Sequence, residues 1–483
     1  MPSSFRLHPL DIAVPALYFV AVLIIGLVQR GRRHGVEEYL LMGRKLTAPA
    51  FIMSLVSAWY GGILGVSEYS YNYGLSNWFV FGVPYYLHAL IFAIFFARLA
   101  RRTKNYSIPD RLETVYGSGA ARIGALVIVV ITMPAAYLLM AGKMTAWIFG
   151  WTYPAGLLAA VLFSTIYIYA GGLRSVVRTD VFEFIIMYAG FVMMVLMLGS
   201  HYGGISFLRA NVKPELFTPL GGQAFAAVFV WYIIASTTLI EPLFYERVSA
   251  LEKERTALPG ILMAIVFWAI FDFMTTTTGL YARALLPDLK DPSYAFPELA
   301  RLVLPVGAFG FFLAALLATI MSTVNAYTFL AAKTLGQDLI WKGSAARDPN
   351  QVQPLVRRWL LVTTVAATLL ALASDSIVNL WHGLGSIAAP VLLLPTLTSW
   401  SGKHAYPRRF VVLGMIASGL VSLFWQLWQV YMGGTYPFGI EPIYVGLGVS
   451  GVIYAGGRMF TKPQSAPGTE ERSKLRDYPK INP

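Results

Sequence analysis

Residues 53–65 read Met-Ser-Leu-Val-Ser-Ala-Trp-Tyr-Gly-Gly-Ile-Leu-Gly, in the middle of an apolar segment that runs from 47 to 74. A helix needs about 20 mostly apolar residues to cross a membrane, so this segment can span one. The pair Gly61 and Gly62 weakens the helix in mid-span. Unwinding there frees carbonyls over about 53–58, because each helical carbonyl bonds the amide four residues ahead. Such breaks are tolerated at membrane depth where they line a cavity. Small residues also serve close helix packing, and the spacing alone leaves both interpretations open.

The composition of the whole chain also indicates a protein that lies in a membrane. Of 483 residues, 57% are hydrophobic and 13% are charged, against about 45–50% and about 25% in soluble domains. The lipid bilayer is therefore the expected solvent. Thirteen apolar segments qualify as spans of an all-α polytopic membrane protein: 10–29, 47–74, 77–99, 120–149, 152–171, 178–200, 222–245, 257–282, 306–335, 356–374, 376–400, 409–431 and 438–459.

Basic residues alternate between the predicted loops. They cluster after every odd-numbered span, beginning with Arg30, Arg32 and Arg33. Cytoplasmic loops carry such an excess, so the N-terminus is expected outside and the C-terminus in the cytoplasm of a plasma membrane, the inner membrane if the source is bacterial. The same loops account for the net charge of +13 without a nucleic-acid partner. The tail 461–483 is expected to be a disordered cytoplasmic end.

The ninth span carries a hydroxyl-bearing face. Thr319, Ser322 and Thr323 follow i, i+3 and i+4 spacing, which places them on one side of a helix. Hydroxyl and carbonyl oxygens suit a hard cation. The alternative is that the three hydroxyls bond back to their own helix.

Ionisable residues inside predicted spans also need a role or a route to water. They are Glu68, Lys143, Asp180, Glu183, Glu241 and Asp272. His88 and His382 are lone histidines without metal-ligand spacing. The chain has no cysteine and therefore no thiol chemistry.

Four stretches carry a family resemblance: 38–44, 53–74, 169–180 and 315–325, with a weaker echo at 246–253. They resemble the sodium:solute symporter family, in order, over about residues 10–400. The resemblance implies the leucine-transporter type of fold, with two inverted five-helix repeats. The repeats are expected at 47–200 and 222–400. A peripheral helix and loop (1–46) precede them, and two peripheral helices (401–460) follow.

The resemblance also implies the positions of the ion sites. Sodium is expected between carbonyls of Met53 and Val56 and the oxygens of Thr319, Ser322 and Thr323. Asp180 matches an aspartate near the inner sodium path, which can support a second ion. The family's further hydroxyls are replaced here by Asn325 and Ala326, so one ion is favoured.

The solute is expected near the midplane, between the repeats. Sugar transporters of the family carry a glutamine where this chain has Tyr60, so a sugar is not favoured. In the seventh span Pro242 is present but no mid-span glycine, which leaves a break there open. The expected solute-site residues are Tyr60, Gly61, Gly62, Ile63, Glu68, His88, Tyr232, Trp381 and His382.

The function predicted from these features is sodium-coupled symport of a small organic solute by alternating access, with Na+ as the coupling ion. The chain is not expected to be an enzyme, because no appended catalytic domain, nucleophile–base motif or metal cluster stands out. Two alternatives stay open. One is proton coupling on the same fold through Glu68, Asp180 or Asp272, and the other is a membrane solute sensor.

Overall fold

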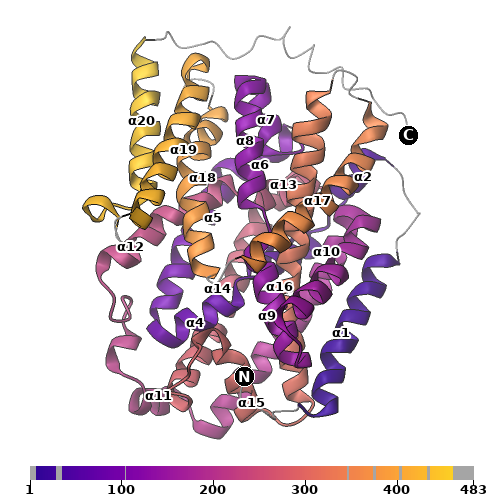
Figure 1. Ribbon diagram of the computed structural model, residues 1–483, viewed down its shortest axis with the longest axis vertical. Helices are drawn as coiled ribbons and strands as arrows, with labels where there is room; N and C mark the ends of the chain where they lie inside the picture. The colour runs from indigo at the N-terminus through magenta and orange to yellow at the C-terminus, as the bar shows by residue number, and fades with distance from the viewer. Residues whose placement is uncertain are drawn as a thin grey trace.

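The computed structural model describes residues 7–28, 35–103, 105–344, 348–373, 377–401, 405–431 and 436–460, with the side chains of 377–382, 384 and 430 excepted. The predicted tail 461–483 lies outside these residues. The described chain is built from helices, with no strand and one isolated bridge between Leu46 and Leu251. Figure 1 shows the helices running mostly along the long axis of the molecule.

The first half of the chain contains α1 (Pro9–Leu27), α2 (Val36–Leu41), α3 (Ala48–Trp59), α4 (Ile63–Tyr73), α5 (Val83–Ile91), α6 (Ala97–Arg102), α7 (Ile108–Tyr116), α8 (Ser118–Ile131), α9 (Ala135–Phe149), α10 (Tyr153–Tyr202) and α11 (Ile205–Asn211). The second half contains α12 (Phe225–Ile234), α13 (Pro242–Ala250), α14 (Ala257–Leu285), α15 (Ala295–Val303), α16 (Ala308–Lys333), α17 (Val352–Leu372), α18 (Ile377–Ser399), α19 (Arg408–Tyr431) and α20 (Pro442–Phe460).

Short segments of other helix types join or extend these helices. Three are π-helical: η2 (Trp78–Gly82), η3 (Phe92–Phe96) and η8 (Thr334–Trp341). The 3-10 segments are η1 (Met42–Arg44), η4 (Pro214–Phe217), η5 (Ala235–Ile240), η6 (Glu254–Thr256), η7 (Pro292–Tyr294), η9 (Pro349–Gln351) and η10 (Pro437–Gly439).

Ten described helices are long and apolar enough to span a membrane, or eleven if the bent pair α3 and α4 counts as one span. Two predicted spans, 152–171 and 178–200, lie in the single 50-residue helix α10. A helix of that length measures about 75 Å, against about 30 Å of hydrocarbon, and Gly172 interrupts it with φ 59° and ψ −147°. The predicted span 376–400 borders residues outside the description. The count of thirteen is therefore not confirmed and stays a prediction.

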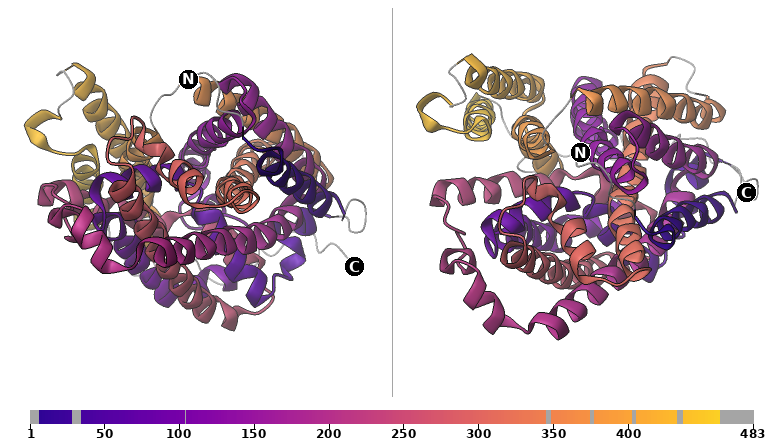
Figure 2. Two further views of the ribbon diagram at one scale, coloured as in Figure 1. Left: turned by 90° about the horizontal axis from the view of Figure 1, so that it is seen from below. Right: turned by 60° about the horizontal axis from the view of Figure 1, so that its bottom comes forward.

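Helix α16 stands at the centre of the bundle. In its most apolar window 89% of the residues are buried, against 22% in α20, and Figure 2 shows α16 surrounded by other helices while α19 and α20 stand at one edge. Close packing needs small residues: a Cβ on Gly190 of α10 would collide with Ala315 of α16. The outer helices instead expose apolar side chains, such as Leu420 of α19 at 60%. This is the pattern of a protein whose surrounding solvent is lipid.

Candidate functional site

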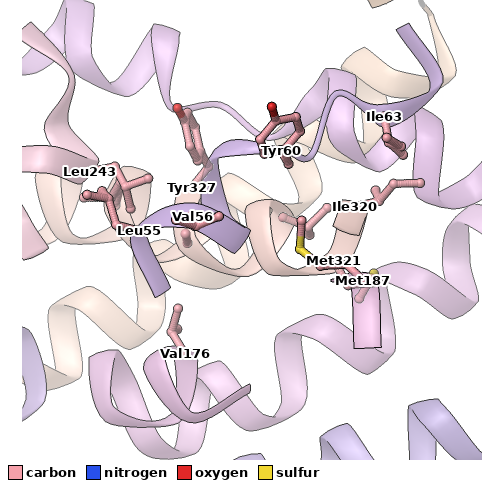
Figure 3. Packing of buried hydrophobic residues seen from close by; sticks show 14 of the residues in the cluster. Leu55, Val56, Tyr60, Ile63, Val176, Met187, Leu243, Ile320, Met321 and Tyr327 are labelled. Carbon is pink, nitrogen blue, oxygen red and sulfur yellow. The ribbon is translucent and has the colours of Figure 1, made fainter. Parts of the chain in front are cut away.

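The predicted break in the second span is present between α3 and α4. The two helices differ in direction by 62°, and residues 60–62 join them. The Tyr60 amide bonds the Ser57 carbonyl at 3.3 Å, three residues back instead of four. This leaves the Val56 carbonyl outside the regular helical pattern, whereas that of Met53 lies within α3. Figure 3 shows Val56 and Ile63 on either side of the break with Tyr60 between them.

Helix α16 lies against this break and reaches it with hydroxyl groups. Ser322 Oγ donates to the Ser57 carbonyl at 2.8 Å, and Thr323 Oγ1 donates to the Ala58 carbonyl at 2.8 Å. Gly61 packs so closely on the Thr323 side chain that a Cβ there would collide with it. The structure thus brings Ser322 and Thr323 together with the broken helix. Their spacing predicted only that they share a helix face, and the family resemblance implied the partner helix.

The Thr319 hydroxyl behaves differently. It donates to the Ala315 carbonyl of its own helix at 2.7 Å, which is the alternative considered from the sequence. Its carbonyl accepts from Ser322 Oγ at 3.1 Å and so faces the same cluster. The cluster therefore combines neutral carbonyl and hydroxyl oxygens from two helices, all buried, which are the ligands that hard cations prefer.

Asp180 lies in a buried ionic network next to these oxygens. Its Oδ2 accepts from the Ser54 hydroxyl on α3 and from Arg247 Nη2 on α13 at 3.2 Å. Arg247 Nε also donates to Ser54 Oγ at 2.8 Å. Glu246 continues the network with contacts of 2.8 Å to Arg247 and 3.1 Å to Lys333 of α16. Two carboxylates and two cations from three helices thus balance one another, and Ser54 links them to α3.

The other side of the break faces α14. The Tyr60 hydroxyl donates to the Trp268 carbonyl at 3.2 Å, and the Tyr60 and Phe271 ring centroids are 4.5 Å apart. Ile63 is fully buried. The break therefore has two distinct surroundings, oxygen atoms toward α16 and aromatic rings toward α14.

The contacts described for His88, Tyr232 and Glu68 are with residues outside the break. His88 Nδ1 lies 2.8 Å from the Pro84 carbonyl of its own helix. Tyr232 stacks on Phe229, which is 43% exposed. Glu68 is half-buried, with Asp291 and Lys143 as its charged neighbours. The side chains of Trp381 and His382 lie outside the described residues.

Two features of this region were underestimated from sequence. The seventh predicted span is also broken: η5 is followed by Glu241 in an extended conformation (φ −72°, ψ 114°) and then by α13. Pro242 was the signal, because the residue before a proline disfavours the helical region. The second feature is Asp272, which the sequence offered as an intramembrane carboxylate and a candidate for proton coupling but not as a solute-site residue. It accepts a hydrogen bond from the Tyr86 hydroxyl beside Tyr60.

Comparison with known proteins matches this chain to a family model, to a curated relative and to solved structures. A family model described as Sodium:solute symporter family matches residues 39–400. A sodium/proline symporter from Staphylococcus aureus is 25% identical over 497 residues, covering 96% of this chain and 95% of that protein.

Two solved structures share the fold over most of the chain. A Na+-coupled sialic acid symporter, in a substrate-bound outward-open state, superposes with a TM-score of 0.81 at 16% identity, covering 95% of this chain and 99% of the other. Mhp1, a nucleobase-cation-symport-1 family transporter in a closed conformation, gives a TM-score of 0.59 at 12% identity, covering 91% and 97%.

Proposed function

Because the chain belongs to the sodium:solute symporter family, it is a sodium-coupled symporter of a small solute, and we propose that it binds its sodium ion between α3 and α16. It is a multi-pass membrane transporter and not an enzyme. It has the fold of the transporters it superposes on, the leucine-transporter type. The proposed ligands are the carbonyls of Met53, Val56 and Thr319 and the hydroxyls of Ser322 and Thr323.

The observation that carries the proposal is the pair of hydroxyl-to-carbonyl bonds from Ser322 and Thr323 to the last turn of α3. The hydroxyls turn their lone pairs toward a bound cation, which takes the place of these two bonds. The ion then ties a helix of the first repeat to a helix of the second. Solute that binds beside the same break is stabilised by the ion, and the ion by the solute, because such coupling is reciprocal.

One sodium ion per solute is the proposed stoichiometry. Asp180, the carboxylate of the expected inner ion path, already has the Arg247 guanidinium 3.2 Å from Oδ2. A positive side chain there supplies the charge that a second sodium would bring. Asn325 and Ala326 also lack the hydroxyls that the family uses at that position.

The two repeats are proposed at 47–200 and 222–400. Support comes from their first spans, which are both broken: α3 and α4 in one, η5 and α13 in the other. Residues 1–46, 401–460 and 461–483 are proposed to lie outside the repeats.

The proposed orientation has the N-terminus outside and the C-terminus in the cytoplasm of the plasma membrane. Helices α6 and α7, beside the basic residues Arg101 and Arg111, lie toward one end of the molecule, and α11 and α15 lie toward the other (Figure 1). This separation supports the positive-inside assignment.

Uptake into proteoliposomes tests the function. Proline is the first solute to try, because relatives at 25% identity are sodium/proline symporters. External sodium should drive accumulation that equal potassium, at the same clamped membrane potential, does not. A potential of about 100 mV adds about 2.3 kcal/mol for one charge, so uptake should also rise with an inside-negative potential. Equal uptake in sodium and potassium, for every solute found to be transported, would refute sodium coupling.

Sodium binding can be measured without any solute. Sodium should raise the thermal unfolding midpoint of the purified chain above the value in equal potassium, because a ligand that binds only the folded state stabilises it. Ser322→Ala combined with Thr323→Ala should remove this difference.

A further inference from the structure

Asp272 lies in the middle of the spanning helix α14, and its carboxylate is not neutralised by any described side chain. It is 1% exposed. The Tyr86 hydroxyl donates to Oδ2, and the Tyr60 hydroxyl also lies within hydrogen-bonding reach of the carboxylate, while Oδ1 has no partner. The salt bridges found in the described part of the chain do not include it. A carboxylate at membrane depth is costly unless it is protonated or paired with a positive charge, and a bound ligand can supply that charge.

Several other buried acids have charged or backbone partners, whereas Glu183 resembles Asp272 in accepting only from a tyrosine hydroxyl, that of Tyr18. Asp180 and Glu246 pair with Arg247. Asp11 accepts hydrogen bonds from the amides of Gly307 and Gly310 at 2.7 and 2.9 Å. Asp272 joins no helix end and no ion pair, and it stands beside the broken helix, where Tyr60 is its neighbour.

Three tyrosines, Tyr60, Tyr86 and Tyr188, interact with this carboxylate, and two of them belong to a larger group of aromatic rings. Tyr60 and Tyr188 both pack on Phe271, with centroid distances of 4.5 and 5.2 Å, and the Trp59 and Trp268 centroids are 5.8 Å apart. The faces of such rings attract organic cations. A carboxylate among aromatic rings is therefore a site for an ammonium group rather than for an anion.

The backbone next to Asp272 carries no side chain at Gly82, which leaves space for the carboxylate. Gly82 ends the π-helical segment η2, and a Cβ there would collide with Trp78, the Tyr86 hydroxyl and Asp272 Oδ2. Local π-helical turns recur at functional sites because they re-aim the side chains around them.

We propose that Asp272 binds a positively charged nitrogen of the transported solute, which makes that solute an organic ammonium compound. This inference rests on the proposed function, because it places the solute on the α14 side of the break and sodium on the α16 side. The nitrogen belongs either to a simple cation or to a zwitterion with a carboxylate of its own. A purely anionic solute is disfavoured, since its charge would meet that of Asp272 in a medium of low dielectric constant.

A thermal-shift panel on the full purified chain in sodium tests the proposal. The probes are proline and glycine betaine as zwitterions, choline and primary to tertiary alkylamines as cations, lactate as an anion and glucose as a neutral solute. At least one ammonium probe should stabilise the protein, and lactate and glucose should not. Stabilisation by lactate or glucose alone, or by none of the ammonium probes, would overturn the proposal.

Substitution then ties the bound probe to Asp272. Asp272→Asn should weaken its binding at least about 30-fold, the loss typical when one partner of a buried charge pair is removed. The matched control is Asp288→Asn in the exposed loop after α14, which should bind as the wild type does. Unchanged binding by Asp272→Asn would contradict the assignment. If that variant does not fold, Asp272→Glu, which keeps the charge, should bind the same class of probe, and selection of lactate or glucose by it would count against the proposal.

The sodium site and the solute site at Asp272 can be refuted independently of each other. Sodium alone should still raise the unfolding midpoint of Asp272→Asn, because its ligands lie on α16 and α3. If Asp272→Asn no longer binds the solute but is still stabilised by sodium, the role of Asp272 is supported. If sodium does not stabilise the wild type, the sodium site is refuted, but the result of the solute panel still holds. The charge moved per solute separates the two kinds of ammonium compound: with one sodium it is one for a zwitterion and two for a permanent cation.

Discussion

The Ser322 hydroxyl donates a hydrogen bond to the Ser57 carbonyl at 2.8 Å and so joins α16 to the last turn of α3. Thr323 makes the equivalent bond one residue along each helix. These contacts lie where the proposed sodium ion would hold the two proposed repeats together.

Loss of both hydroxyls should therefore weaken sodium binding. Ser322→Ala with Thr323→Ala is expected to raise the sodium concentration for half-maximal uptake at least about tenfold, since each lost polar contact costs about 1 kcal/mol or more. Thr363→Ala is the matched control, because that hydroxyl bonds only within α17, at 2.6 Å to the Trp359 carbonyl and 3.1 Å to the Leu360 carbonyl. An unchanged sodium dependence in the double variant would remove these residues from the site.

Gly61 should not tolerate a side chain. Gly61→Ala places a Cβ into Thr323, which separates α4 from α16 and should abolish most transport. Gly448→Ala on α20, where a Cβ meets no atom within 4 Å, should leave transport intact and stabilise the helix by about 0.5–1 kcal/mol. Uptake and thermal unfolding of both variants measure the contrast; wild-type uptake by Gly61→Ala would show that this contact is dispensable.

The ionic network should depend on Arg247, whose side chain is fully buried. Arg247→Met leaves Asp180 and Glu246 without this partner and should lower the unfolding free energy by about 3–5 kcal/mol. Arg301→Met breaks a surface pair with Glu298, in which the arginine is 42% exposed, and should cost less than about 1 kcal/mol. Adding Asp180→Asn to Arg247→Met should recover part of the loss, and equal costs for the two arginine variants would argue against the network.

The number of sodium ions moved per solute tests independently whether Arg247 takes the place of a second sodium ion. The wild type should move one sodium per solute, so the reversal potential of the coupled current should shift by about 59 mV for a tenfold change in the sodium gradient when the solute is a zwitterion held at constant concentration ratio. A tenfold change in the solute gradient should shift it by the same amount. A sodium shift twice the solute shift would indicate two ions.

The absence of cysteine makes orientation directly measurable. Lys213→Cys and Lys253→Cys each introduce one thiol at an exposed loop position, on opposite sides according to the proposed topology. A membrane-impermeant maleimide should label position 213 in intact cells and position 253 only after permeabilisation. The reverse labelling pattern would show that the orientation is opposite to the proposed one.

Much of the sodium region could be predicted from local features of the chain. Gly61 and Gly62 predicted the break, and the spacing of Ser322 and Thr323 predicted a shared hydroxyl face. The break begins after Trp59, so the helix keeps the Met53 carbonyl in its regular pattern. Glycines lower the stability of a helix over several residues, and tertiary contacts decide which of those residues unwinds.

What the sequence alone determined is that this chain lies in a membrane, that its second span carries a glycine pair able to break it, and which residues share a helix face. These follow from hydropathy, backbone propensity and helical periodicity, all of which act within a few residues. Only the tertiary structure decided that Arg247 meets Asp180, 67 positions away, and that Tyr86 meets Asp272, 186 positions away. Periodicity defines the faces of a helix, but the packing of the whole bundle selects which faces meet, and a buried charge finds its partner only once that packing is complete.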